Sequence, residues 1–176
     1  MLFHPGDEIG AILDKLRYFV KRAVPHLFLF LLFVFQFLPF ESLTGSVGIR
    51  FLLMGIFFWS LFRPTLLPLY VVFIYGLATD VLYGYAIGLY AVIYTLICFF
   101  IRYYRQRLSS QSFWLLWAMF GLILTFLMGV DLLYSQVFMG GHFPLFQALG
   151  KVVLSALVFP FVNMLLFYQN LWLSKK

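Results

Sequence analysis

Long apolar runs separated by short polar connections make up most of the chain. Six runs are long enough to form membrane-spanning helices, since a bilayer core needs roughly 20 apolar residues per helix and fewer where flanking residues reach the interface. The predicted spans cover residues 23–40, 47–62, 64–82, 85–101, 113–138 and 146–173. Short connections make successive spans antiparallel neighbours. The pattern therefore predicts an all-α fold, with a six-helix transmembrane domain over residues 23–173.

The two ends of the chain differ from this domain. Over residues 9–20, apolar residues recur at helical spacing while basic residues fall toward the opposite face. This pattern indicates that residues 1–22 form an amphipathic helix in the headgroup plane. A plain helical extension of the first span explains it equally well. Residues 174–176 form a short basic tail.

Composition strengthens the membrane assignment. The chain is 64% hydrophobic, only 10% charged and has a mean hydropathy of +1.01, whereas about 25% of residues are charged in soluble domains. The net charge of +6 does not indicate nucleic-acid binding, because the basic residues flank apolar runs instead of forming one patch. We expect an integral membrane protein.

The basic residues also predict orientation. In a six-span topology, ten of the 12 Lys and Arg residues fall on one side, and only Arg50 and Lys151 fall on the other. The positive-inside rule therefore places both termini in the cytoplasm.

Candidate catalytic groups are sparse. His4, His26 and His142 are far apart and share no metal-ligand spacing with each other or with Cys98. No nucleophile, phosphate-loop or paired-acid motif occurs. We expect no catalytic residue, no cofactor and no metal site.

Two acids lie in predicted spans. Asp80 comes 16 residues after Pro64, about 24 Å along its helix, and Asp131 reaches about 27 Å along the fifth span. Both are predicted near the non-cytoplasmic interface. Each could cap a helix end or pair locally with Arg50 or Lys151, or serve a function directly. These alternatives stay open for Asp80, while the structural one is favoured for Asp131.

Small residues mark close approaches and turns. Gly76, Asp80, Gly84 and Gly88 recur every four positions. We expect Gly84 to end the third span and Gly88 to begin the fourth, which gives a tight outer hairpin.

Two later spans carry further packing signals. Gly121, Thr125 and Gly129 repeat small-residue spacing in the fifth span, which favours internal packing over a dimer face. Pro160 and Asn163 predict a kinked structural helix in the sixth. The first span is bulky throughout, so we expect it to face lipid or a partner.

The segment FWSLFRPTLLPLYVVFIYGLATDVLYGYAIGLYAVIY resembles the bacterial rod shape-determining protein MreD family. An aromatic-rich span ends in an Arg-Pro turn, and a span with Gly and Asp four residues apart follows, then glycines leading into the next span. The matching positions are Arg63, Pro64, Gly76, Asp80, Gly84, Gly88 and Leu89. Residues 85–87 depart from the family, which often has a proline there.

The resemblance implies a non-enzymatic inner-membrane scaffold of the rod complex, or elongasome, which organises lateral-wall peptidoglycan synthesis and cell shape. It implies direct binding to an MreC-like protein, with MreB, RodA and a class B penicillin-binding transpeptidase as further complex members. Membrane lipids would surround the protein. The resemblance does not decide whether it forms a homodimer. Exposed aromatics on spans 23–40 and 47–62 are the first candidates for a partner surface.

The family also resembles the S-component fold of energy-coupling-factor transporters. The alternative function is therefore a substrate-binding membrane subunit of a vitamin-type transporter. Against it, span 23–40 lacks the small-residue A-x-x-x-A stripe of those subunits, and few polar groups could line a ligand pocket.

Overall fold

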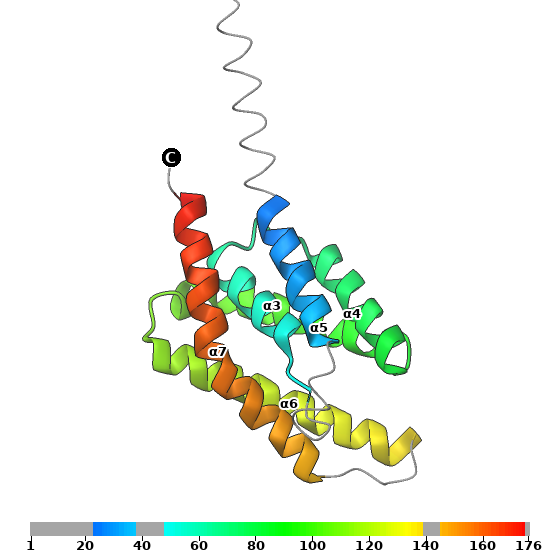
Figure 1. Ribbon diagram of the computed structural model, residues 1–176. Helices are drawn as coiled ribbons and strands as arrows, with labels where there is room; N and C mark the ends of the chain where they lie inside the picture. The colour runs from blue at the N-terminus through cyan, green and yellow to red at the C-terminus, as the bar shows by residue number, and fades with distance from the viewer. Residues whose placement is uncertain (1–22, 38–47, 139–144, 175–176) are drawn as a thin grey trace, which may run out of the picture.

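The computed structural model describes residues 23–37, 48–138 and 145–174, and within these ranges the regular structure is helical without strands. The six described helices are Ala23–Gln36, α3 (Phe51–Phe62), α4 (Leu69–Tyr83), α5 (Leu89–Leu108), α6 (Phe113–Phe138) and α7 (Leu145–Ser174) (Figure 1). The predicted all-α class is confirmed. The amphipathic segment 1–22 and most of the basic tail lie outside the described residues.

Two helices meet the length and hydropathy needed to cross a membrane, namely Phe113–Phe138 and the segment Ala148–Leu171 of α7. Three further apolar helices are shorter, at 10–17 residues: Ala23–Gln36, Phe51–Phe62 and Leu69–Tyr83. The number of spans therefore stays a prediction, although each described helix falls largely within one predicted span.

Helix α3 forms the centre of the molecule. Every residue from Leu52 to Leu61 is buried, so the helix has no polar or solvent-facing side. The ring of Phe57 packs edge-on against Phe120 of α6 and Phe159 of α7, with centroids 5.6 and 5.7 Å apart. The expectation that aromatics of span 47–62 form a partner surface is wrong, because they constitute the core.

Helix α3 is covered from several sides. It packs against α5 and α7, while α4 pairs with α5 and α6 pairs with α7. Helix Ala23–Gln36 approaches it at Gly55, where an added Cβ would lie 2.8 Å from Leu29 Cδ1. The buried Gln36 side chain accepts a hydrogen bond from the Leu52 amide at 3.3 Å, which satisfies a free donor at the start of α3.

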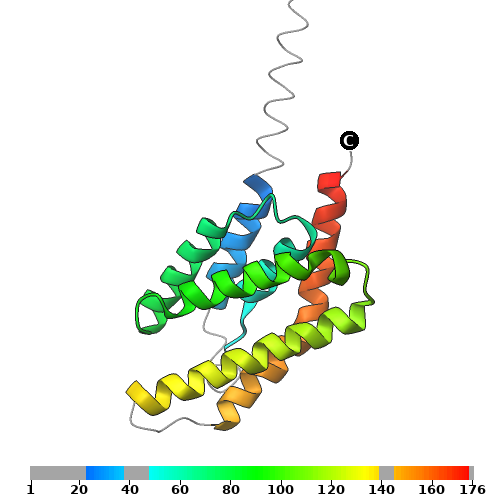
Figure 2. The same ribbon diagram turned by 180° about the vertical axis from the view of Figure 1, so that it is seen from behind.

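Helices α4 and α5 form a closely packed hairpin, seen as the two green helices in Figure 2. A Cβ at Gly76 would lie 2.3 Å from the Ala91 Cα atom and 2.7 Å from its nitrogen, so no side chain fits there. Gly84 follows α4 at φ +70° and Gly88 precedes α5 at φ +101°. Both are left-handed conformations that favour glycine. The predicted hairpin is confirmed.

The connection before α4 is longer than predicted. The sequence suggests a helix from Pro64, but α4 begins at Leu69, and residues 64–67 form turns. Pro68 disfavours helical geometry at Leu67, which delays the helix start. Likewise α5 begins at Leu89 instead of residue 85, because the chain first completes the turn between the two glycines.

Helices α6 and α7 cross as a second pair, fastened by a 2.8 Å hydrogen bond from Trp117 Nε1 to the Ala156 carbonyl. A Cβ at Gly121 or Gly129 would meet nothing within 4 Å among the described residues. The expectation that the Gly121–Thr125–Gly129 stripe packs internally is therefore wrong for this part of the chain. Helix α7 runs through Pro160 and changes direction along its length (Figure 1).

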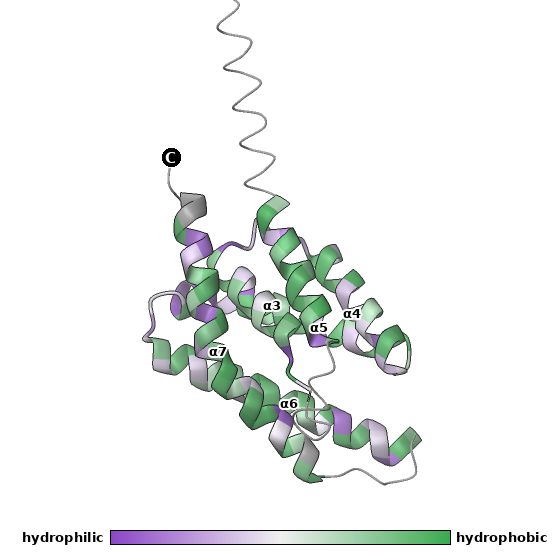
Figure 3. Ribbon diagram, viewed as in Figure 1, coloured by the Kyte–Doolittle hydropathy of each residue, from purple (hydrophilic) through white to green (hydrophobic). Residues whose placement is uncertain are grey.

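Apolar residues predominate along the described helices (Figure 3). Large apolar side chains are exposed on α4, α5, α6, α7 and helix Ala23–Gln36, among them Leu27, Ile74, Leu96, Leu122 and Phe161. A surface of this kind suits hydrocarbon rather than water.

Candidate functional site

Asp80 lies in the last turn of α4 and caps the neighbouring helix. Its Oδ1 atom accepts a hydrogen bond from the Tyr90 amide at 2.8 Å, and Oδ2 accepts from the Gly88 amide at 2.9 Å. The Ala91 amide lies 3.4 Å from Oδ2. These N–H groups begin α5 and have no intrahelical acceptor, and a carboxylate is favourable at a helix N-terminus. The contacts of Asp80 are those of the capping alternative.

The position of Asp80 explains the spacing of the glycines around it. The side chain is 0% exposed, because Gly76 lets the two helices approach and the glycine-bounded turn brings the start of α5 back over α4. Sequence analysis placed Asp80 near an interface but did not anticipate complete burial within the protein.

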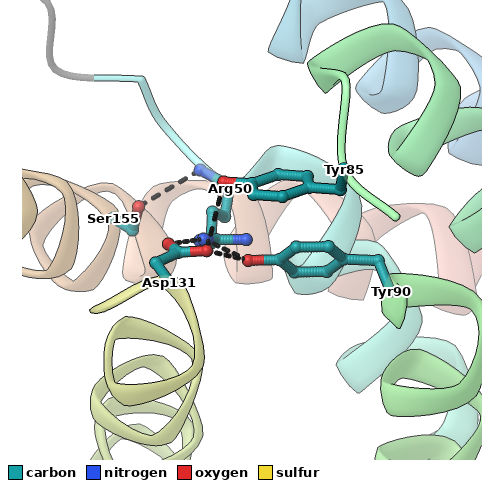
Figure 4. A network of polar contacts seen from close by, with 5 residues as sticks. All are labelled: Arg50, Tyr85, Tyr90, Asp131 and Ser155. Carbon is teal, nitrogen blue, oxygen red and sulfur yellow. Dashed lines mark hydrogen bonds and ion pairs between the residues drawn. The ribbon is translucent and has the colours of Figure 1, made fainter. Parts of the chain in front are cut away.

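Asp131 of α6 is the centre of a second polar cluster, drawn in Figure 4. It forms an ion pair with Arg50 and accepts a hydrogen bond from the Tyr90 hydroxyl. The Tyr85 hydroxyl donates a further hydrogen bond to Oδ1 at 3.2 Å. Pairing of Asp131 with Arg50, one of the two partners suggested by the sequence, is confirmed.

Arg50 joins four helices. It directly precedes α3, and its backbone amide donates to the Ser155 hydroxyl of α7 at 3.1 Å. Its guanidinium donates to the Tyr90 hydroxyl of α5 at 2.9 Å and lies 5.2 Å from the centre of that ring. With Asp131 on α6, one arginine thereby connects both helix pairs to the central helix (Figure 4).

Two tyrosine hydroxyl groups complete the contacts of the Asp131 carboxylate. Tyr85 lies in the turn between α4 and α5, and Tyr90 is the second residue of α5. Both hydroxyl groups donate to the same carboxylate oxygen, Oδ1. Arg50 balances the single negative charge, as a buried carboxylate requires.

Beside the cluster are two small cavities that share Arg50 and Lys151. Gly48, Ile49, Arg50, Thr79, Tyr83, Tyr85 and Lys151 line the first cavity. Arg50, Leu124, Met128, Asp131, Ala148, Lys151 and Val152 line the second, between α6 and α7. Over the described ranges, no group of three or more His, Cys, Asp or Glu residues could hold a metal ion.

The remaining residues singled out in the sequence lie elsewhere. Arg63 precedes α4 at the end opposite Asp80, and its Nε donates to Asn170 Oδ1 of α7 at 2.9 Å. Pro64 occupies the turn that follows, and Leu89 is the first residue of α5. Asn163 is half-buried and makes no hydrogen bond among the described residues. The structure thus divides the motif between the two ends of α4.

Sequence reasoning missed Ser155, Tyr85 and Tyr90. Tyr85 and Tyr90 flank Gly88 in the quoted segment, so their nearness to the hairpin was a usable signal. Ser155 is a single hydroxyl in an apolar helix, and no pattern in the sequence distinguishes it from other serines.

The fold and the cluster define a class: an all-helical membrane protein whose buried charges serve contacts within the helix bundle. Comparison with family models is more specific. The chain belongs to the rod shape-determining protein MreD family, whose model matches residues 17–169. No curated protein and no solved structure gives a significant match. Membership implies a role in rod shape determination and favours a shape-determining protein over a transporter subunit.

Proposed function

We propose that this protein is a non-enzymatic scaffold in the bacterial inner membrane that helps to organise the rod complex and lateral-wall peptidoglycan synthesis. The observation that carries the proposal is that both buried acids are engaged in contacts between helices. Asp80 is occupied by backbone amides of α5, and Asp131 is occupied by Arg50 and two tyrosines. These groups hold helices together and leave no free acid in the described site for proton transfer.

A rigid frame of this kind presents fixed apolar surfaces to other helices. Helix Ala23–Gln36 packs Leu29 and Leu32 inward, while Leu27, Phe30, Leu31, Val34 and Phe35 form one exposed face. We define these five residues as the first-helix face. Helices in hydrocarbon associate through close packing rather than exclusion of water, so a fixed shape matters more than apolarity.

The direct partner in this proposal is the transmembrane helix of an MreC-like protein, seated on the first-helix face. MreB, RodA and a class B penicillin-binding transpeptidase would join as further members of the complex. The proposal retains six spans with both termini in the cytoplasm, because ten of the 12 basic residues then share that side.

Co-purification from detergent-solubilised membranes tests this proposal. The tagged wild-type protein should recover the MreC-like partner, and the double variant Phe30→Ala/Leu31→Ala should recover several-fold less at equal abundance. Leu122→Ala, an exposed apolar position on α6, is the matched control and should behave as wild type. Recovery of a transporter ATPase in place of the MreC-like protein would overturn the proposal.

A further inference from the structure

The hairpin of α4 and α5 is shorter than a bilayer of ordinary thickness. Helix α4 has 15 residues, and at the rise of an α-helix it is about 22 Å long. The apolar part of α5 runs from Leu89 to Ile101, about 20 Å, and Arg102 follows it. A hydrocarbon core is about 30 Å thick, and any inclination of the helices lowers the height that they cover.

The backbone at both ends of the hairpin prevents the span from being longer. Residues 64–67 form turns before α4, and residues 84–88 connect α4 to α5 through two left-handed glycines. Lipid-exposed backbone without helical hydrogen bonds does not occur within hydrocarbon, because its N–H and C=O groups find no partners there. Ile87 is 80% exposed in the second turn, so that turn is not enclosed by the protein. The two turns therefore belong at opposite interfaces.

Polar contacts and tyrosines indicate the same two levels. The Arg102 guanidinium donates to the Leu67 carbonyl, which joins the first cation of α5 to the turn before α4. Tyr70 and Tyr103 are exposed near this end, and Tyr83 is exposed at the other. Tyrosine side chains of this kind are enriched at membrane interfaces. Along α4, Tyr70 and Tyr83 are about 20 Å apart.

The surface between these levels is apolar. Asp80 is the only charged residue from position 69 to position 101, and it is buried. Exposed side chains include Ile74 of α4 and Leu96 of α5. The other helix pair is longer, since α6 has 26 residues and reaches about 39 Å. Only the hairpin side of the protein is therefore too short for an ordinary bilayer.

We propose that the α4–α5 hairpin thins the bilayer beside it and selects phospholipids with short acyl chains. The hydrocarbon next to the hairpin is then about 20 Å thick, while α6 keeps the ordinary thickness by inclining. The inference rests on the six-span arrangement of the proposed function, in which α4 and α5 cross the membrane. It goes beyond the scaffold role, because it concerns the lipid around this chain and not a protein partner.

Thinning fits the hairpin better than the other response open to a short helix. Flanking lysine or arginine side chains can reach from a short span to the headgroups. Arg102 and Arg63 are available for this at the cytoplasmic end, but the sequence has no lysine or arginine from residue 64 to residue 101. The end at the glycine-bounded turn therefore has no such side chain, and the bilayer must come to it.

The experiment measures which lipid contacts each side of the purified full-length protein. A fluorophore is attached to Leu96→Cys or Leu122→Cys in a Cys98→Ala background, and the protein is reconstituted in brominated dioleoylphosphatidylcholine, whose bromine atoms quench it. Unbrominated dioleoyl or short-chain dimyristoleoyl phosphatidylcholine is then mixed in. At Leu96 we expect dimyristoleoyl lipid to relieve quenching about threefold more effectively than dioleoyl lipid.

Leu122→Cys is the matched control, because Leu122 is 71% exposed on the longer α6 and Leu96 is 60% exposed on the hairpin. It should show no preference for the short chain. Ile74→Cys on α4 is a second hairpin position and should respond as Leu96→Cys does.

Equal relief by the two lipids at Leu96 and Ile74 overturns the proposal, as does the same short-chain preference at Leu122. Absence of quenching at Leu96 and Ile74 in pure brominated lipid would place the hairpin outside the bilayer, and would overturn both the proposal and the six-span arrangement. Failure of the scaffold role is detected separately, by co-purification of the MreC-like partner.

Discussion

Arg50 and Asp131 lie 81 positions apart in the chain and form an ion pair between the start of α3 and the C-terminal third of α6. The Tyr90 hydroxyl bonds to both members, accepting from Arg50 and donating to Asp131. One buried ion pair therefore sets the position of α5 and α6 relative to the central helix.

Removing one member of this pair should cost more than removing both. Arg50→Met or Asp131→Leu alone leaves an unpaired buried charge, which we expect to lower the free energy of unfolding by about 3–5 kcal/mol. The double variant removes both charges and should be more stable than either single variant. Thermal unfolding of the four proteins in one detergent gives the comparison, and purely additive losses would contradict a coupled pair.

Asp80 should behave as a structural cap. Asp80→Ala leaves up to three amide donors at the start of α5 without their acceptor, at a cost of about 1–3 kcal/mol for each buried donor left unpaired. Asp80→Asn keeps one acceptor atom and should lose less. Membrane abundance and melting temperature should therefore be highest for the wild type, lower for Asp80→Asn and lowest for Asp80→Ala.

Asn163→Ala is the control for this series, because it removes a half-buried amide that has no hydrogen bond within the described part of the chain. A fully stable, fully complexed Asp80→Asn protein that had lost a transport activity would instead assign Asp80 a direct function.

Gly76 and Gly121 should respond in opposite ways to the same added methyl group. At Gly76 the Cβ would overlap the backbone of Ala91, so Gly76→Ala should separate α4 from α5 and lower stability by about 1–3 kcal/mol. At Gly121 nothing lies within 4 Å, so Gly121→Ala should be neutral or raise stability by up to about 1 kcal/mol through helix propensity. Equal losses in both variants would show that Gly121 also packs closely.

The α4–α5 turn and the chain termini should lie on opposite sides of the membrane. Single cysteines placed at Ile87 and near either terminus, in a Cys98→Ala background, can be labelled with an impermeant maleimide on intact spheroplasts. We expect labelling at Ile87, which is 80% exposed, and none at the termini until the membrane is opened. Labelling of a terminus from outside would contradict the six-span topology.

The sequence predicted the helical class, the α6 bounds and the glycine-bounded hairpin, because these depend on apolar run length and backbone conformation. It also suggested Arg50 as a partner of Asp131, since Arg50 and Lys151 are the two basic residues on the predicted non-cytoplasmic side. It misplaced the aromatics of span 47–62, which lie in the core. In a membrane protein, lipid-facing and core-facing positions are both apolar, so hydropathy does not distinguish α3 from helix Ala23–Gln36.

The contacts of single hydroxyl groups were also beyond sequence reasoning. Ser155 reaches the Arg50 amide only because α3 and α7 pack together, a contact between residues 105 positions apart. The lack of close neighbours at Gly121 and Gly129 could not be predicted for the same reason. Which stripe of α6 faces inward depends on how α6 is rotated relative to α7.

Cell shape tests the central claim most directly. In a rod-shaped bacterium depleted of its own family member, expression of this protein together with its MreC-like partner should restore rods, measured as the ratio of cell length to width. The Phe30→Ala/Leu31→Ala variant, at equal abundance, should leave the cells rounded. Rounded cells with abundant wild-type protein and partner, or full rods with the double variant, would contradict a scaffold that acts through the first-helix face.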